Sequence, residues 1–287
     1  MLWMQKLTYS KTDTITLNKK LYLPRNNINM LKVITHQPSL ALQQCELTFL
    51  ESQKIDYKRA LQQHQAYCKM LSKCGAQVVQ LNENTHLPDS VFVEDPIIVF
   101  NELAVLSSMG VESRRPESAA FERLFRRYRK IERISLPAKI EGGDVLKVGK
   151  RIYVGESPRT NCLGIEALTD IIEPLGYEVI PVKVHGCLHL KTGCTALDDT
   201  TFLINTEWVD HTPFKGFTTI ATLPEEPFGG NVLPLNGYIC MNSVFPKTVK
   251  LVAALGYTIA SVDISEFVKA EAGLTCMCIP FLDAGTQ

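Results

Sequence analysis

The chain has 287 residues, of which 45% are hydrophobic and 21% are charged, as in an ordinary globular protein with a sizeable core. Its 30 Lys and Arg residues balance 30 Asp and Glu residues, so no excess charge favours binding to nucleic acid or to an anionic membrane surface. No apolar run approaches the roughly 20 residues that cross a bilayer or forms a secretory signal, and the nine cysteines lack a disulfide framework, so we expect a cytoplasmic protein with reduced thiols.

Residues 1–29 are polar and weakly patterned, and we expect them to form a loosely attached N-terminal extension. Beyond them, strand-like and helix-like segments alternate along the chain. Apolar residues at helical spacing predict helices over 56–75, 116–131, 164–176 and 246–256. Short apolar or alternating runs predict strands within 30–38, 76–81, 96–100, 103–108, 144–155, 177–184, 194–205 and 257–264.

The helix predicted over 56–75 has the clearest ends, because Asp56 is a suitable N-cap and Gly75 suits the position just after the last turn. No linker rich in Pro, Gly or Ser divides the chain after the extension, so we expect one α/β domain over residues 30–287. The repeated order of strand, helix and strand suggests a repeat architecture, although no fixed sequence period supports it.

Three carboxylates, those of Asp89, Glu94 and Asp95, lie within an apolar stretch. That stretch, DSVFVEDPIIV, predicts a buried strand, or two strands broken at Pro96. Burying an unpaired carboxylate is costly, so the acids indicate a cationic partner unless they lie at a solvated sheet edge. Adjacent residues of a strand face opposite sides, so Glu94 and Asp95 reach one ligand only if Pro96 or a bend redirects one of them.

Two further stretches place charged residues at predicted turns. Arg114 and Arg115, in ESRRPES, precede a predicted helix. An Arg fork binds a carboxylate through two hydrogen bonds, and the alternative is a solvated basic pair. Glu141 and Asp144, in KIEGGDVL, flank two glycines at the mouth of a predicted strand. Glycine lets the backbone approach closely, so this stretch either presents carboxylates to a cavity or is a plain turn.

His189 and Cys276 are the candidates for acid–base and nucleophilic chemistry. His189 lies in the apolar context CLHLK, which suits either a buried core histidine or a catalytic one. Cys276 begins an apolar run after a short loop, where a thiol is either inert or, with a histidine nearby in space, a nucleophile. A zinc site built from these two residues with Cys278 and His185 lacks a second cysteine pair, so we expect no metal.

Together these residues suit one class of substrate. A thiol, an imidazole, several carboxylates and arginines fit a molecule with a cationic head and a carboxylate tail. An amino acid with a guanidinium side chain has this form, because its planar cation offers N–H donors to carboxylates and its own carboxylate suits an arginine.

The sequence resembles the dimethylarginine dimethylaminohydrolases, or dimethylargininases, of the guanidino-modifying pentein superfamily. The resemblance covers about residues 30–287, and the segment 1–29 lies outside it. Five stretches carry it in matching order and approximate spacing: DSVFVEDP, GVESRRPE, EGGDVLKVGKRIYVGESPRTN, LHLKTG and GLTC. It implies a pentein α/β propeller, in which five strand–helix modules surround a pseudo-fivefold axis and the active site occupies the central channel.

The resemblance also implies an activity. The expected reaction is hydrolysis of asymmetric dimethylarginine or monomethylarginine to citrulline and dimethylamine or methylamine, through a covalent thiouronium-type intermediate. No metal or organic cofactor is expected. The expected binding partner is a small molecule, the methylated arginine, and family members are often homodimers.

Individual roles follow from the same resemblance. Cys276 corresponds to the nucleophile, His189 to the general acid and base, and Glu141 to the carboxylate that orients His189. The remaining residues form a substrate-binding set. Its acidic side chains would hold the guanidinium and amino groups of the substrate, its arginines would hold the α-carboxylate, and two of its backbone carbonyls would hold the amine. That set consists of Leu47, Asp89, Glu94, Asp95, Arg114, Arg159 and Ala270.

Two stretches depart from the family pattern. SSMG, at 107–110, replaces a common Arg-Pro-Gly, and KAEAGLTC differs from the usual Val/Ile-Asp-Gly before the cysteine. The main alternative is an arginine deiminase, but Lys191 stands where that family's His-x-Asp motif carries Asp. Another guanidine hydrolase or an amidinotransferase is a further alternative. A non-catalytic pentein that binds partners would have lost catalytic groups, and all of them are present here.

Overall fold

The structure is a computed structural model that describes residues 30–283, so the extension expected at residues 1–29 lies outside the described residues. The described chain forms five three-stranded sheets. The strands are β1 (Met30–His36), β2 (Gln77–Leu81), β3 (Ile97–Val99), β4 (Leu103–Leu106), β5 (Lys130–Arg133), β6 (Val145–Val148), β7 (Arg151–Glu156), β8 (Glu178–Lys183), β9 (Cys194–Ala196), β10 (Thr201–Ile204), β11 (Thr218–Ala221), β12 (Leu233–Leu235), β13 (Tyr238–Asn242), β14 (Thr258–Val262) and β15 (Ile279–Asp283).

Short helices connect these strands. The α-helices are α1 (Tyr57–Lys73), α2 (Ser118–Phe125), α3 (Cys162–Ile172), α4 (Leu190–Gly193), α5 (Pro246–Ala254) and α6 (Ser265–Val268). The 3₁₀ helices are η1 (Leu42–Gln44), η2 (Glu112–Glu117), η3 (Gly142–Asp144), η4 (Glu173–Leu175), η5 (Thr212–Phe214), η6 (Pro227–Gly230) and η7 (Thr275–Met277). None of the helices described within residues 30–283 combines the length and the apolar character that a membrane crossing requires.

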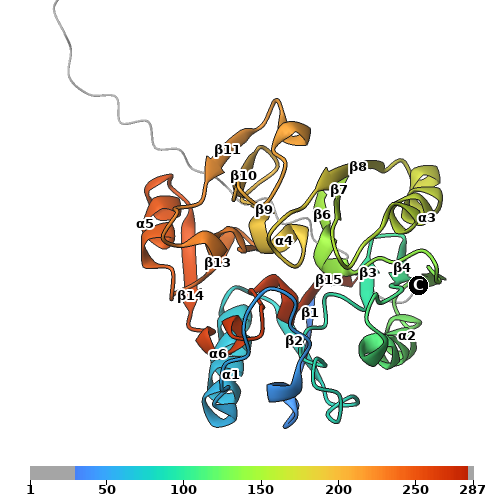
Figure 1. Ribbon diagram of the computed structural model, residues 1–287, viewed down its shortest axis with the longest axis horizontal. Coiled ribbons are helices and arrows are strands. Elements are labelled where there is room, and N and C mark those ends of the chain that lie inside the picture. Colours follow the sequence, from blue (N-terminus) through green and yellow to red (C-terminus); the bar gives the residue numbers. More distant parts are fainter. Residues whose placement is uncertain (1–29, 284–287) are drawn as a thin grey trace, which may run out of the picture.

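The five sheets repeat one topology. In each sheet the middle strand pairs antiparallel with one neighbour and parallel with the other. A parallel pair needs a crossover connection, and α1, α2, α3, α5 and η5 lie in the five crossovers. Figure 1 shows the sheets around a common centre, with α1, α2, α3 and α5 on the outside. The expected α/β fold with five repeated modules is therefore confirmed.

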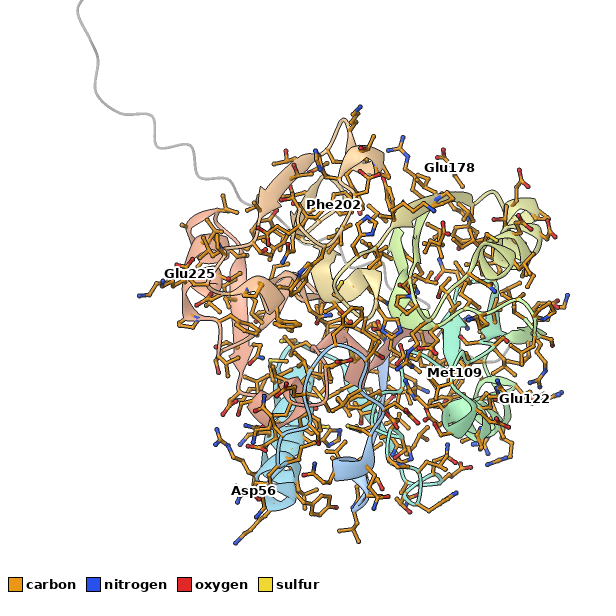
Figure 2. The ribbon with its side chains drawn as sticks, viewed as in Figure 1. Asp56, Met109, Glu122, Glu178, Phe202 and Glu225 are labelled. Atoms are coloured by element: carbon orange, nitrogen blue, oxygen red, sulfur yellow. The ribbon has the colours of Figure 1, made fainter. Side chains whose placement is uncertain are left out.

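The core lies between each sheet and the elements that cover it. Under α1, for example, the buried residues Tyr67 and Leu71 belong to one cluster with Val33 of β1 and Phe267 of α6. The side chain of Asp56 accepts a hydrogen bond from the Arg59 backbone N–H at 3.1 Å, and Gly75 has a φ of 87°, so both predicted ends of α1 are confirmed. Figure 2 contrasts the buried Met109 and Phe202 with Asp56, Glu178 and Glu225 at the periphery.

The helix predicted over 116–131 is wrong in its second half. It ends at Phe125, and Lys130 and Ile131 begin β5, which pairs in parallel with β4. Helical spacing continues past Phe125, but the third strand of this sheet comes from the same stretch. Pairing with a strand that is distant in sequence therefore determines the structure here.

The strand predicted within 89–99 is also shorter than expected. Only Ile97–Val99 is a strand, and the preceding residues form turns. One of these turns is closed by the Phe92 backbone N–H, which donates to the carbonyl of Asp89 at 2.8 Å. Val91 and Val93 are nevertheless buried. A short apolar run thus marked burial correctly but did not distinguish a strand from a buried turn.

Candidate active site

Polar residues lie just before the same strand in several sheets, namely the outer strand that pairs antiparallel with the middle strand. Glu94 and Asp95 lie just before β3, and Glu141 lies before β6. His189 lies before β9, and Cys276 before β15. Because the modules surround one centre (Figure 1), these equivalent positions meet there, although they are far apart in sequence.

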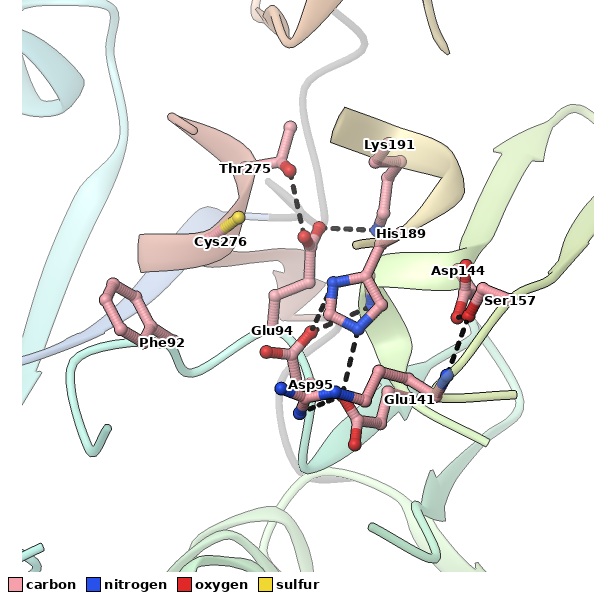
Figure 3. A network of polar contacts seen from close by, with 12 residues as sticks. Phe92, Glu94, Asp95, Glu141, Asp144, Ser157, His189, Lys191, Thr275 and Cys276 are labelled. Atoms are coloured by element: carbon pink, nitrogen blue, oxygen red, sulfur yellow. Dashed lines mark hydrogen bonds and ion pairs between the residues drawn. The ribbon is translucent and has the colours of Figure 1, made fainter. Parts of the chain in front are cut away.

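His189 and Glu141 form a buried pair in this cluster. The His189 Nε2 atom lies 2.9 Å from Glu141 Oε2, and the two residues are 3% and 0% exposed. The second Glu141 oxygen accepts from the backbone N–H of Gly110 at 3.1 Å, and His189 Nδ1 lies 3.9 Å from Asp95 Oδ1 (Figure 3). Burial by itself lowers the pKa of His189, but the carboxylates of Asp95, Asp144 and Glu141 raise it to about 9. The imidazole is therefore protonated at neutral pH.

Arg114 is enclosed by protein acceptors. Its guanidinium donates to the two oxygens of Glu117 at 3.0 and 2.9 Å, to Asp95 Oδ2 at 2.8 Å and to the Phe92 carbonyl at 3.2 Å. The predicted fork exists, and in this buried position it holds Glu117 and Asp95. Burial disfavours a charged Asp95, but protonated His189 and Arg114 lower its pKa, so this carboxylate stays ionised.

Glu94 links the Cys276 loop to α4. Its carboxylate accepts hydrogen bonds from Lys191 Nζ at 2.5 Å and from Thr275 Oγ1 at 2.8 Å, and its backbone N–H donates to the Cys276 carbonyl at 3.2 Å. Figure 3 shows the Cys276 side chain directed towards Glu94. Burial raises the pKa of the Cys276 thiol, and the carboxylates of Glu94 and Asp95 raise it further. The thiol is therefore neutral unless a further cation enters the cluster.

The two glycines of the stretch EGGD allow the cluster to close. A Cβ atom on Gly142 would stand 2.0 Å from the carbonyl oxygen of Glu94. A Cβ atom on Gly143 would stand 2.6 Å from His189 Nδ1 and 2.8 Å from Asp95 Oδ1. Real Cβ atoms essentially never come this close, so a side chain at either position would force the neighbouring groups to move. The close backbone approach predicted for this stretch is confirmed.

Asp144 fixes the backbone next to His189. One of its oxygens accepts from the Leu190 N–H at 2.8 Å, and the other accepts from Ser157 Oγ at 2.6 Å and Thr160 Oγ1 at 2.7 Å. Burial raises the pKa of Asp144 to about 6, although His189 and these donors oppose the shift. Its hydrogen bonds to protein donors indicate a structural carboxylate within the site.

Asp89 and Arg159 lie around the loop 46–50. The Asp89 carboxylate accepts from the backbone N–H of Glu46 at 3.2 Å, and burial raises the pKa of Asp89 to about 6. Arg159 donates to Thr48 Oγ1 at 3.2 Å and lies 3.4 Å from Glu141 Oε2. Arg159 therefore connects this loop to the central His–Glu pair.

Leu47 and Ala270, the two residues expected to offer backbone carbonyls, come from opposite ends of the chain. Leu47 is partly buried in the loop 46–50, and Ala270 is buried just after α6. Glu271, next to Ala270, accepts a hydrogen bond from the Thr48 N–H at 3.1 Å. The structure therefore brings the two segments together.

Several supporting residues were missed by the sequence analysis. Asn231, just before β12, occupies in the fifth module the place that acids, His189 and Cys276 occupy in the others. Its side chain donates to the Lys191 carbonyl at 2.8 Å and to Thr275 Oγ1 at 3.0 Å. Thr275 stands beside Cys276 in the stretch GLTC but was given no role, and Asn231 lies in no recognised motif, so only its equivalent position in the fifth module points to it.

One set of side chains within residues 30–283 has the geometry to hold a metal ion. Asp95, Glu141 and His189 offer ligand atoms within 4.8 Å of one another. A protonated imidazole has no lone pair for a metal, and the raised pKa of His189, about 9, favours that form. A metal ion bound to this set would therefore have to displace the proton from His189. His185, the other histidine of the zinc alternative, is exposed and outside this set.

A cavity of about 240 Å³ adjoins the cluster. Its wall includes residues of β3, β6, β9, β12 and β15, one strand from each module, together with Glu94, Lys191 and Thr275. The described residues that line it do not include Cys276 or His189. The reactive groups thus lie beside this mainly apolar cavity and are not part of its wall.

The chain is similar in sequence to known guanidine-modifying enzymes. A family model described as N,N dimethylarginine dimethylhydrolase, eukaryotic, matches residues 41–211. The N(G),N(G)-dimethylarginine dimethylaminohydrolase of Pseudomonas aeruginosa is 37% identical over 230 residues, which are 79% of this chain and 91% of that protein. The protein of the same name from Streptomyces coelicolor is 38% identical over 254 residues, which are 86% of this chain and 96% of that protein.

Solved structures show the same fold. A mutant of the Pseudomonas aeruginosa enzyme complexed with citrulline has a TM-score of 0.84 and 36% identity, covering 88% of this chain and 100% of that chain. The N-terminal domain of ArgZ, a cyanobacterial arginine dihydrolase, has a TM-score of 0.78 at 20% identity, covering 88% of this chain and 97% of that chain. The second likeness concerns the fold alone.

Proposed function

The chain belongs to the dimethylarginine dimethylaminohydrolase family, and on this basis we propose how its residues carry out the family's reaction. The protein is a hydrolase that converts dimethylarginine to citrulline. One observation carries the proposed roles: the buried His189–Glu141 pair lies beside Asp95 in the same cluster as the Cys276 thiol. In this proposal Cys276 is the nucleophile, His189 is the general acid and base, and Glu141 orients His189.

The first step is activation by the substrate's own charge. Glu94 and Asp95 hold the guanidinium through its N–H donors. The bound cation offsets the two anions that raise the pKa of Cys276, so the thiol loses its proton to solvent. The resulting thiolate attacks the central guanidinium carbon and forms a C–S bond.

His189 then moves the protons. Its Nε2 atom is bonded to Glu141, so Nδ1 is the atom that donates a proton to the departing dimethylamine as the C–N bond breaks. A thiouronium-type intermediate remains on Cys276. The neutral imidazole takes a proton from water, the hydroxide attacks the same carbon, and the C–S bond breaks as citrulline forms. Glu141 stabilises the imidazolium before the first transfer and after the second.

The amino-acid end of the substrate is assigned to a separate group of residues. Arg159 binds the α-carboxylate. The α-amino group binds to Asp89 and to the backbone carbonyls of Leu47 and Ala270. Arg114, which also holds Glu117 and Asp95, is the second proposed ligand of the α-carboxylate.

We also propose that the five modules close into a propeller with the site in its central channel. The pairing of β15 with β1 supports this, because it completes the first sheet with a strand from the end of the chain. A cavity lined by one strand from every module supports it too.

In this proposal residues 30–287 form one catalytic domain of a cytoplasmic homodimer. The nine cysteines are all free, which suits a reducing compartment. Light scattering, which measures the mass of the particle in solution, tests the homodimer.

Cys276→Ser tests the nucleophile. The hydroxyl keeps the shape of the side chain but is not ionised at neutral pH, so we expect a folded protein that binds dimethylarginine and releases no citrulline. Mass spectrometry after treatment with 2-chloroacetamidine should show an adduct on the native protein and none on the variant. Citrulline release by the variant at a near-native rate would refute the assignment.

Parallel assays with dimethylarginine, monomethylarginine and arginine test the substrate class. We expect citrulline from both methylated substrates and slow turnover of arginine. If ammonia release from arginine were the fastest reaction, arginine deiminase chemistry would replace the proposed one.

A further inference from the structure

We propose that Glu271 is a positioning residue that holds the loop 46–50 over the amino-acid end of the substrate. The inference rests on the proposed function, which places the α-amino and α-carboxylate groups beside this loop. Glu271 is 7% exposed and lies on the segment that leads from α6 to Cys276. It is not a catalytic residue, because it acts through the loop.

Glu271 adopts a backbone conformation that favours glycine. Its φ is 59°, its N–H donates to the Val268 carbonyl at 3.0 Å, and the next N–H, of Ala272, donates to the Phe267 carbonyl at 3.1 Å. This is the turn with which a left-handed residue, ordinarily glycine, ends a helix. A residue with a Cβ atom is strained there and persists only when surrounding contacts hold it. Contacts made by the Glu271 side chain must therefore hold the backbone in this conformation.

Those contacts all lead to one loop. The Glu271 carboxylate accepts hydrogen bonds from three consecutive backbone N–H groups, of Thr48 at 3.1 Å and of Phe49 and Leu50 at 2.5 Å each. Hydrogen bonds to an ionised acceptor are about twice as strong as neutral ones. Phe49 is 43% exposed, so burial of its own side chain does not fix the loop. The carboxylate is thus a principal tether.

The tethered loop carries the binding groups of the amino-acid end. Leu47 precedes the three tethered residues, and its carbonyl is a proposed ligand of the α-amino group. Thr48 Oγ1 accepts from Arg159, a proposed ligand of the α-carboxylate, at 3.2 Å. The guanidinium end is held by Glu94 and Asp95, which belong to another segment. Loss of the tether therefore weakens binding of amino-acid substrates and leaves the chemistry at the cysteine intact.

Glu271→Gln and Glu271→Gly test this in the full-length protein. The glycine variant removes the carboxylate and also relieves the backbone strain, so its folding is protected. We expect KM for dimethylarginine to rise about tenfold or more and kcat to stay within about threefold in both variants. Amide hydrogen exchange should accelerate in residues 46–50. Alkylation by 2-chloroacetamidine, which has no amino-acid end, should keep its rate within about twofold. Glu271→Asp, which keeps a carboxylate, should raise KM less than either of these variants.

Glu226→Gln is the matched control. Glu226 is also 7% exposed, and its carboxylate accepts from two backbone N–H groups of the first turn of α5, of Lys247 at 3.0 Å and Thr248 at 2.6 Å, away from the loop 46–50. Its KM should remain native. An unchanged KM in both Glu271 variants would overturn the inference, as would an equal loss of alkylation and turnover. Failure of the native protein to form citrulline would instead refute the proposed function itself.

Discussion

Replacing Gly143 by alanine tests whether the site depends on the close approach of the EGGD turn to the imidazole. The added Cβ atom would stand 2.6 Å from His189 Nδ1, whereas ordinary contact begins at 3.4 Å, so the ring must move by about 0.8 Å. The same Cβ atom would stand 2.8 Å from Asp95 Oδ1, which blocks relaxation in that direction. A displacement near 1 Å at a catalytic group lowers the rate about 100-fold. We expect kcat/KM to fall by about this factor.

Gly229→Ala provides the matched clash outside the site. Its added Cβ atom would stand 2.6 Å from Thr248 Oγ1. Overpacking should destabilise both variants by about 1–3 kcal/mol, measured by urea unfolding. Citrulline release per folded molecule should fall only in Gly143→Ala. A native kcat/KM in Gly143→Ala, or an equal loss in Gly229→Ala, would refute the argument from close approach.

The ionisable groups predict the pH dependence, and a helix cap predicts a stability effect. Glu141→Gln removes an anion hydrogen-bonded to His189, so the pKa of His189, about 9, should fall by about 1–2 units. The basic limb of the pH profile of kcat/KM should move to lower pH with it. A basic limb at the native position would contradict the pairing of Glu141 with His189. In the native protein kcat/KM should fall as the pH drops through about 6, where Asp89 gains a proton, and Asp89→Asn should flatten that limb. Because the folded-state pKa of His189 is raised from 6.5 to about 9, its contribution to stability is complete below pH 6.5 and is lost as the pH rises through about 9; urea midpoints should show this decline in the native protein and not in His189→Gln. Asp56→Ala should cost about 1 kcal/mol of unfolding free energy with native kcat/KM, because it removes only the N-cap of α1.

Local signals predicted the elements whose ends they mark. The helix α1 appears where Asp56 and Gly75 place it, because a cap and a left-handed residue act within one turn. Beyond Phe125 no such signal exists, and the choice between helix and strand is made by pairing with β4. The five-module repeat was likewise indicated only by the repeated order of strand, helix and strand. Each module has a different sequence, and in one of them the 3₁₀ helix η5 stands in place of the α-helix.

Residue types at the site were predictable, but their partners were not. Arg114 was interpreted as a fork for an external carboxylate, whereas Glu117 accepts from it at 3.0 and 2.9 Å. The spacing of three residues was a usable local signal, because such residues face one another on a helical turn. Lys191 and Asn231 gave no comparable signal. Their contacts cross between modules, so they follow from the fold and not from the adjacent sequence.

The charges of the cluster explain why the site suits a cation and releases a neutral product. Before binding, Asp95 and Glu141 are ionised opposite protonated His189, and the Cys276 thiol is neutral. A guanidinium adds one positive charge, and ionisation of the thiol adds one negative charge, so the buried cluster keeps its net charge when the nucleophile forms. Citrulline has a neutral ureido group and cannot offset a thiolate among carboxylates. Cys276 therefore regains its proton when the product forms, and the nucleophile exists only while the correct cation is bound.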